Sequence, residues 1–262
     1  MLKKIALGIV CFGLSAVALM AATPGSDNAN DPAYDSGFSD GTDGGTPQTF
    51  SSWTISINPP GGSAGSFIGD STSLGAGNSG GNINVAGETF GLFAHSGLNA
   101  DATRSFDSGL TAGQTFTIQL AVNFRNGNKG FDLRDATSAT IFNLNIGGDT
   151  YSVNNVTTGG GNLFGDVYDS NTVFSISITQ TDGTGGTWSV TRSGGLAGAA
   201  SGTFTGVGTG IHLYNSMTTG GGAAEDNLFF NNLAVIPEPS SLSLLAGPAI
   251  LGAWFFVRRR RA

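Results

Sequence analysis

Strict two-residue alternation of apolar and polar side chains is the feature that most limits how this chain can fold. The run QTFTIQLAVNF places apolar residues at Phe116, Ile118, Leu120, Val122 and Phe124. Successive side chains of a β-strand point to opposite faces, so this pattern predicts a strand with one buried and one hydrated face.

The same alternation recurs in shorter runs along the chain. Further strands are predicted at TVFSISITQ (172–180), IFNLNI (141–146), WTISI (53–57), TWSVT (187–191) and GIHLY (210–214). Segments such as RNGNKG and TDGTGGT lie between runs and supply the residues that tight turns need. No window has the apolar spacing of a capped amphipathic helix. About a dozen short strands therefore predict an all-β fold, an antiparallel sandwich or jelly roll.

The predicted sandwich domain spans residues 23–236, and the segments at its two ends have patterns of their own. The last run, EDNLFFNNLAVI, changes phase after Phe230, which predicts a β-bulge near Asn231 and Asn232. Residues 23–48 are expected to be either a linker or an edge strand. Tyr34 and Phe38 in this segment indicate that it packs against the domain.

The N-terminus has the order of a secretory signal peptide. Lys3 and Lys4 precede an apolar run, and the small residues Ala21 and Ala22 follow it. We expect residues 1–22 to be a signal helix that is removed, with an uncleaved anchor as the alternative. Cys11, the single cysteine, lies in this run. Removal of residues 1–22 would therefore leave the protein without a thiol for redox chemistry or metal binding.

The C-terminus has the pattern of a short membrane anchor. Residues 242–257 carry no charge, and as a helix they would rise about 24 Å. Four arginines follow: Arg258, Arg259, Arg260 and Arg261. Arginines in this place keep a C-terminus in the cytoplasm, so we expect a transmembrane helix at 242–257 with the preceding domain outside.

Pro237, Glu238 and Pro239 stand before this helix. Together with the terminal arginines, residues 237–262 resemble the PEP-CTERM sorting signal of Gram-negative bacteria. The resemblance implies export through the Sec machinery and transient lodging in the inner membrane. It also implies recognition by an exosortase, and release to the cell surface or beyond, often with biofilm exopolysaccharide. A plain C-terminal anchor is the alternative.

The charge of the chain excludes one class of partner. Between the two ends, 17 carboxylates face five basic residues, Arg104, Arg125, Lys129, Arg134 and Arg192. Such a surface repels phosphate backbones, so nucleic acid is not expected as a partner. The candidate calcium ligands are Asp40, Asp43, Glu225 and Asp226, with aspartates serving as ordinary turn residues as the alternative.

No catalytic group is evident in the sequence. His95 and His212 are the two histidines, and neither lies in a nucleophile motif. His212 points away from Ile211 and Leu213, which suggests that it faces solvent. Glu88 lacks the spaced carboxylate partners of a glycosidase strand. We therefore expect no catalytic residues and a protein that is not an enzyme.

Trp53 and Trp188 could form a platform for sugars, but both alternate in phase with apolar residues, which favours core packing. The acidic, Asn-rich closing strand is loosely similar to those of concanavalin-like and carbohydrate-binding sandwich domains. The expected function is that of a structural or exopolysaccharide-associated matrix protein. The alternatives are a carbohydrate-binding module, with or without structural calcium, and, less favoured, a glycan-active enzyme.

Overall fold

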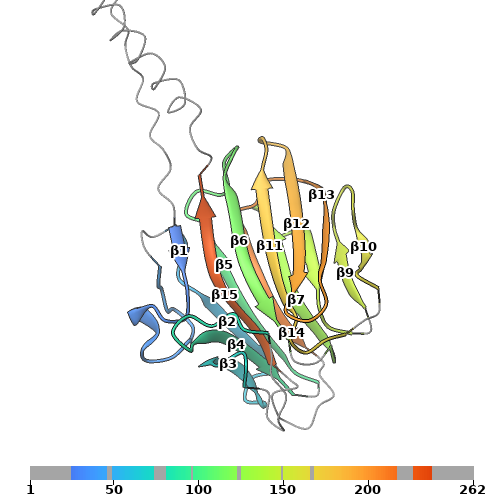
Figure 1. Cartoon of the computed structure of the whole chain (residues 1–262). Coiled ribbons are helices and arrows are strands. Elements are labelled where there is room, and N and C mark those ends of the chain that lie inside the picture. The colour runs from blue at the N-terminus through green and yellow to red at the C-terminus, as the bar shows by residue number, and fades with distance from the viewer. Residues whose placement is uncertain are drawn as a thin grey trace, which may run out of the picture.

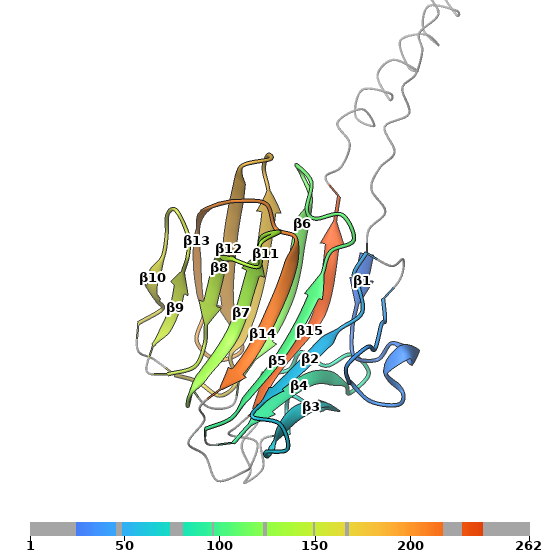
Figure 2. The same ribbon diagram turned by 180° about the vertical axis from the view of Figure 1, so that it is seen from behind.

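The computed structural model describes residues 25–45, 49–73, 81–95, 97–122, 125–148, 150–165, 168–216 and 227–237. These residues form two antiparallel sheets that pack face to face (Figures 1 and 2). The prediction of an all-β sandwich is confirmed. The expected signal helix and the expected transmembrane helix at 242–257 lie outside the described residues. Within those residues, no helix has the length and apolar character needed to cross a membrane.

The first sheet has eight strands, in the order β13-β12-β11-β6-β15-β4-β3, and β1 pairs with β15 beside this path. Its strands are β1 (Gly25–Asp27), β3 (Ala64–Gly69), β4 (Thr89–Ala94), β6 (Thr115–Ala121), β11 (Val173–Gln180), β12 (Gly185–Ser193), β13 (Gly198–Thr205) and β15 (Asn227–Ile236).

The second sheet has seven strands, in the order β10-β9-β8-β7-β14-β5-β2. Its strands are β2 (Thr54–Asn58), β5 (Asn99–Ser105), β7 (Asn128–Arg134), β8 (Thr140–Asn145), β9 (Tyr151–Asn154), β10 (Gly161–Leu163) and β14 (Gly210–Ser216). A single 3₁₀ turn, η1 (Pro32–Tyr34), follows β1.

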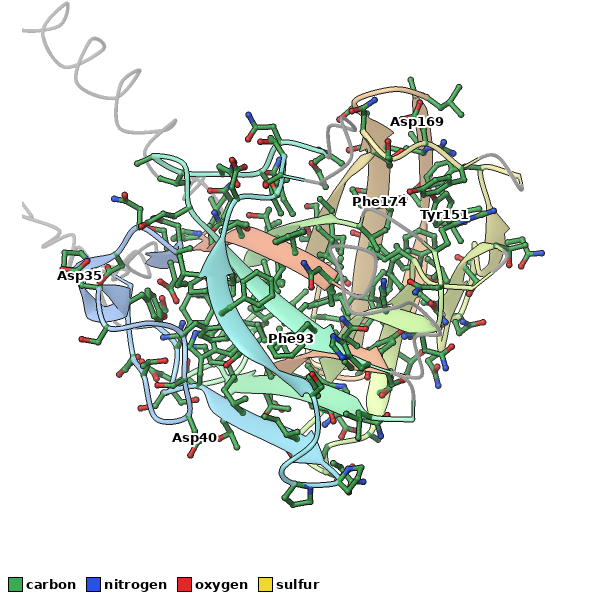
Figure 3. The ribbon with its side chains drawn as sticks, turned by 90° about the horizontal axis from the view of Figure 1, so that it is seen from below. Asp35, Asp40, Phe93, Tyr151, Asp169 and Phe174 are labelled. Atoms are coloured by element: carbon green, nitrogen blue, oxygen red, sulfur yellow. The ribbon has the colours of Figure 1, made fainter. Side chains whose placement is uncertain are left out.

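The core is the layer of inward side chains between the sheets, seen from below in Figure 3. Phe116, Ile118 and Leu120 are buried in the phase that the alternation predicts. Aromatic rings dominate the core, with Phe90 stacked on Phe230 at a centroid distance of 5.3 Å. Trp53 and Trp188 are each 1% exposed, so the prediction that both belong to the core is confirmed.

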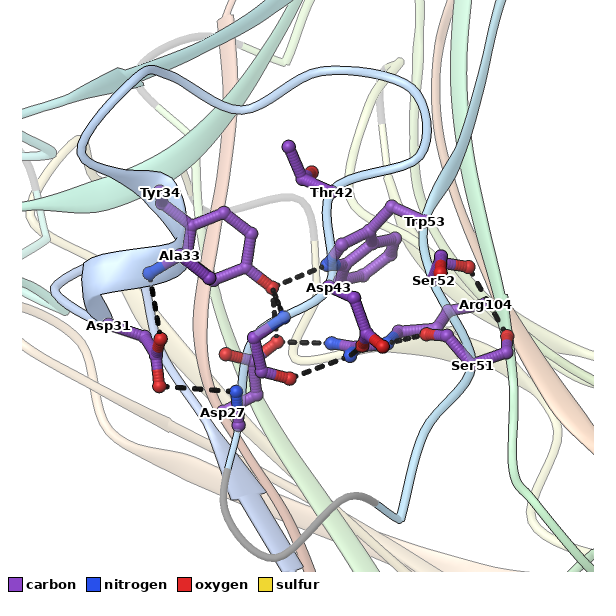
Figure 4. Close-up of polar contacts among 12 residues, drawn as sticks. Asp27, Asp31, Ala33, Tyr34, Thr42, Asp43, Ser51, Ser52, Trp53 and Arg104 are labelled. Carbon is purple, nitrogen blue, oxygen red and sulfur yellow. Dashed lines mark hydrogen bonds and ion pairs between the residues drawn. The ribbon is translucent and has the colours of Figure 1, made fainter.

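Residues 25–45, here called the N-terminal strap, lie along one end of the sandwich. Strand β1 pairs with β15, and Gly25 stands opposite Val235. Tyr34 and Phe38 are both 3% exposed, which confirms that this segment packs on the domain. Figure 4 shows its polar anchor, in which Asp27 of the strap forms a fully buried ion pair with Arg104 of β5.

Strand positions differ from the predictions where the inward residues are not large and apolar. Strand β5 has only small or charged inward residues, such as Ala100, Ala102 and Arg104, and therefore shows no apolar alternation. Strand β7 buries Lys129 and begins within RNGNKG, which was expected to be a turn. The predicted bulge is confirmed, because the register between β15 and β6 shifts between Asn231 and Ala234.

Candidate functional site

Strand register brings several titratable side chains together on the outer face of the seven-stranded sheet. In β14, Ile211 and Leu213 point inward, so His212 and Tyr214 point outward. Two outward rows cross the sheet through these residues. The first is Thr54, Thr103, His212, Asp132, Asn143 and Asn154; the second is Ser56, Asp101, Tyr214, Gly130, Asn145 and Ser152.

His212 is held between two carboxylates. Its Nε2 lies 2.9 Å from Asp101 Oδ1, and its Nδ1 lies 2.8 Å from Asp132 Oδ2. The imidazole is only 12% exposed. Burial acts to lower the pKa of His212, but the hydrogen bonds to Asp101 and Asp132 outweigh it and raise the pKa above its ordinary value. The imidazolium form is therefore favoured further toward neutral pH.

Arg134 gives His212 an alternative partner. Its Nη2 lies 2.6 Å from His212 Nδ1 and 3.6 Å from Asp132 Oδ2. In the imidazolium, Nδ1–H donates to Asp132. In the neutral tautomer that keeps its proton on Nε2, Nδ1 accepts from Arg134 instead. The ring can therefore gain or lose one proton while every nitrogen keeps a partner.

Tyr214 lies beside His212, with ring centroids 5.6 Å apart. Its hydroxyl accepts a hydrogen bond from Asn143 Nδ2 at 2.8 Å. Burial raises the pKa of Tyr214, so the phenol stays protonated at neutral pH. Gly130 makes room for it, because a Cβ atom there would lie 2.5 Å from the Tyr214 hydroxyl and 2.1 Å from the carbonyl oxygen of Leu144.

Asn143 joins these groups into one network, because its Nδ2 also donates to Asp132 Oδ1 at 2.8 Å. The network opens into a depression of about 460 Å³. Its lining contains no aliphatic side chain: Asn99, Asp101, Asn128, Asp132, Thr140, Asn143, Asn145, Asn155, His212, Tyr214 and Ser216. A second depression of about 240 Å³ is lined in part by Thr103, Arg134 and Gly210.

This arrangement offers two kinds of chemistry. Amide and hydroxyl groups act as both donors and acceptors, which suits a ligand rich in hydroxyl groups. The imidazole, set between a cation and two carboxylates, can exchange a proton near neutral pH.

The two predicted calcium ligands that the structure describes, Asp43 and Asp40, each have another partner. Asp43 pairs with Arg104 at 2.8 Å, and Asp40 accepts a hydrogen bond from the backbone N–H of Ile55 at 2.9 Å (Figure 4 shows Asp43). Glu225 and Asp226 lie outside the described residues. Within those residues, no group of three or more potential metal ligands occurs.

His95 and Glu88, which the sequence analysis considered for catalysis, are not among the residues that line the His212 depression. His95 follows β4, where its ring is 5.9 Å from that of Phe93, and Glu88 is exposed in a turn. Pro237 follows β15 directly. The rest of the sorting signal, Glu238, Pro239 and Arg258 to Arg261, lies outside the described residues.

His212 points away from the core as expected, but it is largely covered by its partners and does not lie open to solvent, and those partners were missed. Asp101 and Asp132 come from strands that the alternation does not reveal, and they meet His212 only through strand pairing. The outward phase of His212 and Tyr214 in GIHLY was the one available signal.

The similarities of this chain to known proteins are similarities of structure. No protein-family model matches the chain, and no curated protein matches it. Among solved structures it is similar to a sialidase, at 13% identity and a TM-score of 0.40, over 61% of this chain and 16% of the sialidase. It is also similar to an alginate lyase from Corynebacterium sp., at 11% identity and a TM-score of 0.34, over 81% of this chain and 93% of the lyase. A third is a marine alginate lyase of family PL-14 from Aplysia kurodai, at 11% identity and a TM-score of 0.31, over 70% of this chain and 87% of that one.

These comparisons correct one expectation. These three structures are all named as enzymes, which contradicts the expectation that the chain is not an enzyme.

Proposed function

We propose that this protein binds a glycan on the outer face of its seven-stranded sheet. The observation that carries the proposal is the lining of the His212 depression, where amides and hydroxyls surround the linked Asp132, Asn143 and Tyr214. Sugar hydroxyls need donors and acceptors held in fixed positions, and side chains on a paired sheet meet that need with little loss of entropy on binding. The Tyr214 ring adds an apolar surface for a pyranose face.

Calorimetric titration with a panel of acidic and uncharged polysaccharides tests this proposal. Asn143→Ala removes the donor that fixes both Asp132 and Tyr214, so we expect binding about tenfold weaker, roughly 1.4 kcal/mol. Asn30→Ala, an exposed change on the N-terminal strap, is the matched control and should bind like the natural protein. Absence of binding to every member of the panel would refute the proposal.

A second candidate is a glycan-active enzyme with its acid–base centre at the same place. It is favoured by the two alternative partners of His212 Nδ1, Asp132 and Arg134, which let the ring carry or release a proton. Tyr214, whose pKa is raised, would act as a proton donor.

The enzymatic candidate is tested by measuring cleavage of the same polysaccharides. His212→Gln and Tyr214→Phe should each lower the rate by about 100-fold or more. Turnover that survives both changes would place the chemistry elsewhere.

We further propose that the chain is an exported substrate of an exosortase and associates with exopolysaccharide in the extracellular matrix. The sequence supports this through its N-terminal residues 1–22 and its Pro-Glu-Pro, apolar and arginine tail. The intact mass of the exported protein tests it, because material that still ends at Ala262 would contradict processing. Structural calcium also stays a proposal; an unfolding temperature that falls on chelation would support it.

A further inference from the structure

The outer face of the eight-stranded sheet carries an array of small hydroxyl side chains. Strand register aligns it in three rows across β6, β11, β12 and β13. The rows are Thr115, Thr179, Thr187 and Thr203; Thr117, Ser177, Ser189 and Ser201; and Gln119, Ser175, Thr191 and Ala199. We call these twelve positions the hydroxyl lattice.

The lattice contains no charged residue, although the chain has a net charge of −7. An exposed sheet face that served only solubility would be expected to mix charges of both signs. The lattice therefore differs both from an ordinary wet face and from the His212 face, where two carboxylates and two basic groups meet.

The hydroxyl groups are available to a ligand. Two hydrogen bonds run within the lattice, Thr115 to Thr179 at 2.8 Å and Gln119 to Ser175 at 3.2 Å. Ser177, Ser189 and Thr191 take part in none of the side-chain hydrogen bonds among the described residues. These three side chains also line a shallow depression of about 430 Å³.

The lattice is ordered before any ligand arrives. Neighbouring strands lie about 4.8 Å apart, and outward residues of one strand recur about every 6.8 Å. The β-branched threonines have restricted χ1 angles, so little side-chain entropy is lost on contact. A repeating set of donors and acceptors suits a repeating ligand.

We propose that the hydroxyl lattice binds an uncharged polysaccharide, as a second glycan surface opposite the His212 face. A polyanion would find no counter-charge on it, and neither would a polycation. A stable protein partner would need aromatic or large apolar anchors, which the twelve positions lack. Uncharged hydroxyl groups are also far cheaper to desolvate than ions.

The inference rests on the proposed function in taking a glycan as ligand, and it extends that function. Two binding faces on opposite sides of one domain can hold two chains at once. The protein would then cross-link polysaccharide, and its apparent affinity for a dense matrix would exceed that of either face alone.

The test is depletion of the folded, exported protein from solution by insoluble uncharged polysaccharides, namely cellulose, chitin and mannan. Thr187→Lys with Thr191→Lys places two charges on exposed positions of β12 and should weaken binding at least tenfold. Thr187→Ser with Thr191→Ser keeps both hydroxyls and should bind like the natural protein. Ala112→Lys with Ala139→Lys adds the same charge in exposed turns as a control. Equal unfolding temperatures would show that all variants fold.

This experiment distinguishes failure of the lattice proposal from failure of the His212 proposal. Asn143→Ala should leave adsorption through the lattice intact, so loss of binding only in this variant would overturn the lattice proposal and leave the His212 face standing. Adsorption by the double-lysine variant within twofold of the natural protein would also overturn it. The proposal would also be overturned if polysaccharide binding is absent and the two lysines instead abolish adsorption to ice or self-association in sedimentation.

Discussion

His212 shows how a single residue can acquire properties that its neighbours in the chain do not suggest. Its flanking residues are apolar and face the core, whereas its own contacts are Asp101, Asp132, Arg134 and the Tyr214 ring. Together these groups keep the site close to neutral while holding a titratable ring at its centre. Because the two carboxylates stabilise the imidazolium, His212 ties proton binding to the stability of the sheet.

We therefore predict a pH-dependent contribution from His212. Its folded-state pKa lies above its unfolded value, so the contribution is full below about pH 6.5 and is lost as the pH rises through the folded pKa. His212→Gln should destabilise the domain by about 1.5–3 kcal/mol at pH 5.5 and by less at pH 9. Urea unfolding at both pH values measures this, and an equal loss at both would count against it.

Gly130 is the residue on which the position of Tyr214 depends. Alanine there would force its Cβ atom against the Leu144 carbonyl and the Tyr214 hydroxyl. We expect Gly130→Ala to cost about 1–3 kcal/mol in unfolding free energy and to weaken glycan binding. Calorimetry with thermal unfolding checks both effects. Unchanged stability and binding would show that the sheet can accommodate a Cβ atom at position 130. Gly183→Ala, in an exposed turn with open space around it, is the matched control.

At the scale of elements, the N-terminal strap is joined to the sandwich by one buried charge network. Arg104 pairs with Asp27 and Asp43 and donates to the Gly44 carbonyl, while its guanidinium lies 5.1 Å from the Trp53 ring. The Tyr34 hydroxyl donates to Asp27 at 2.7 Å and accepts from Trp53 Nε1 at 3.0 Å. Each polar group that fixes the strap thus depends on the others for its hydrogen-bond or ion-pair partner.

Breaking this network on one side should be costly. Arg104→Met leaves Asp27 buried without its cation, and we expect a loss of about 3–5 kcal/mol. Asp27→Leu combined with Arg104→Met removes both charges and should recover much of that loss. Denaturant unfolding with hydrogen exchange across residues 25–45 would report it. If the single and the double change cost the same, the ion pair is not what holds the strap.

At the scale of the whole molecule, one sandwich presents two different outer faces, and strand β15 completes it. Strand β15 pairs with β1, β4 and β6, and it brings Phe230 into the aromatic core. The two described ends of the domain therefore lie side by side, with Gly25 opposite Val235 (Figure 1).

This placement predicts how truncation affects folding. A chain that stops after Pro237 keeps every strand pair of β15, so its unfolding midpoint should lie within a few degrees of that of the longer chain. A chain that stops after Ser216 loses β15 and should fail to unfold cooperatively. Thermal denaturation followed by circular dichroism compares the two. Cooperative melting of the shorter chain would show that β15 is dispensable.

The sequence by itself determined the class of fold. Successive side chains of a strand point to opposite faces, so an alternation of apolar and polar residues identifies strands and their buried side. That rule placed Phe116, Ile118 and Trp188 in the core, put His212 on an outer face, and located the bulge near Asn231. Strands such as β5 and β7 escaped it, because Arg104 and Lys129 point inward. Arg104 pairs with the distant Asp27 and Asp43, and Lys129 donates to Asn126. Only the tertiary structure decided which outward residues meet. Asp101, Asp132 and His212 are far apart in the chain, and long-range pairing sets the order and register that bring them together. The same pairing aligned scattered Thr and Ser residues into the hydroxyl lattice, whereas the path of the N-terminal strap brought Asp43 to Arg104.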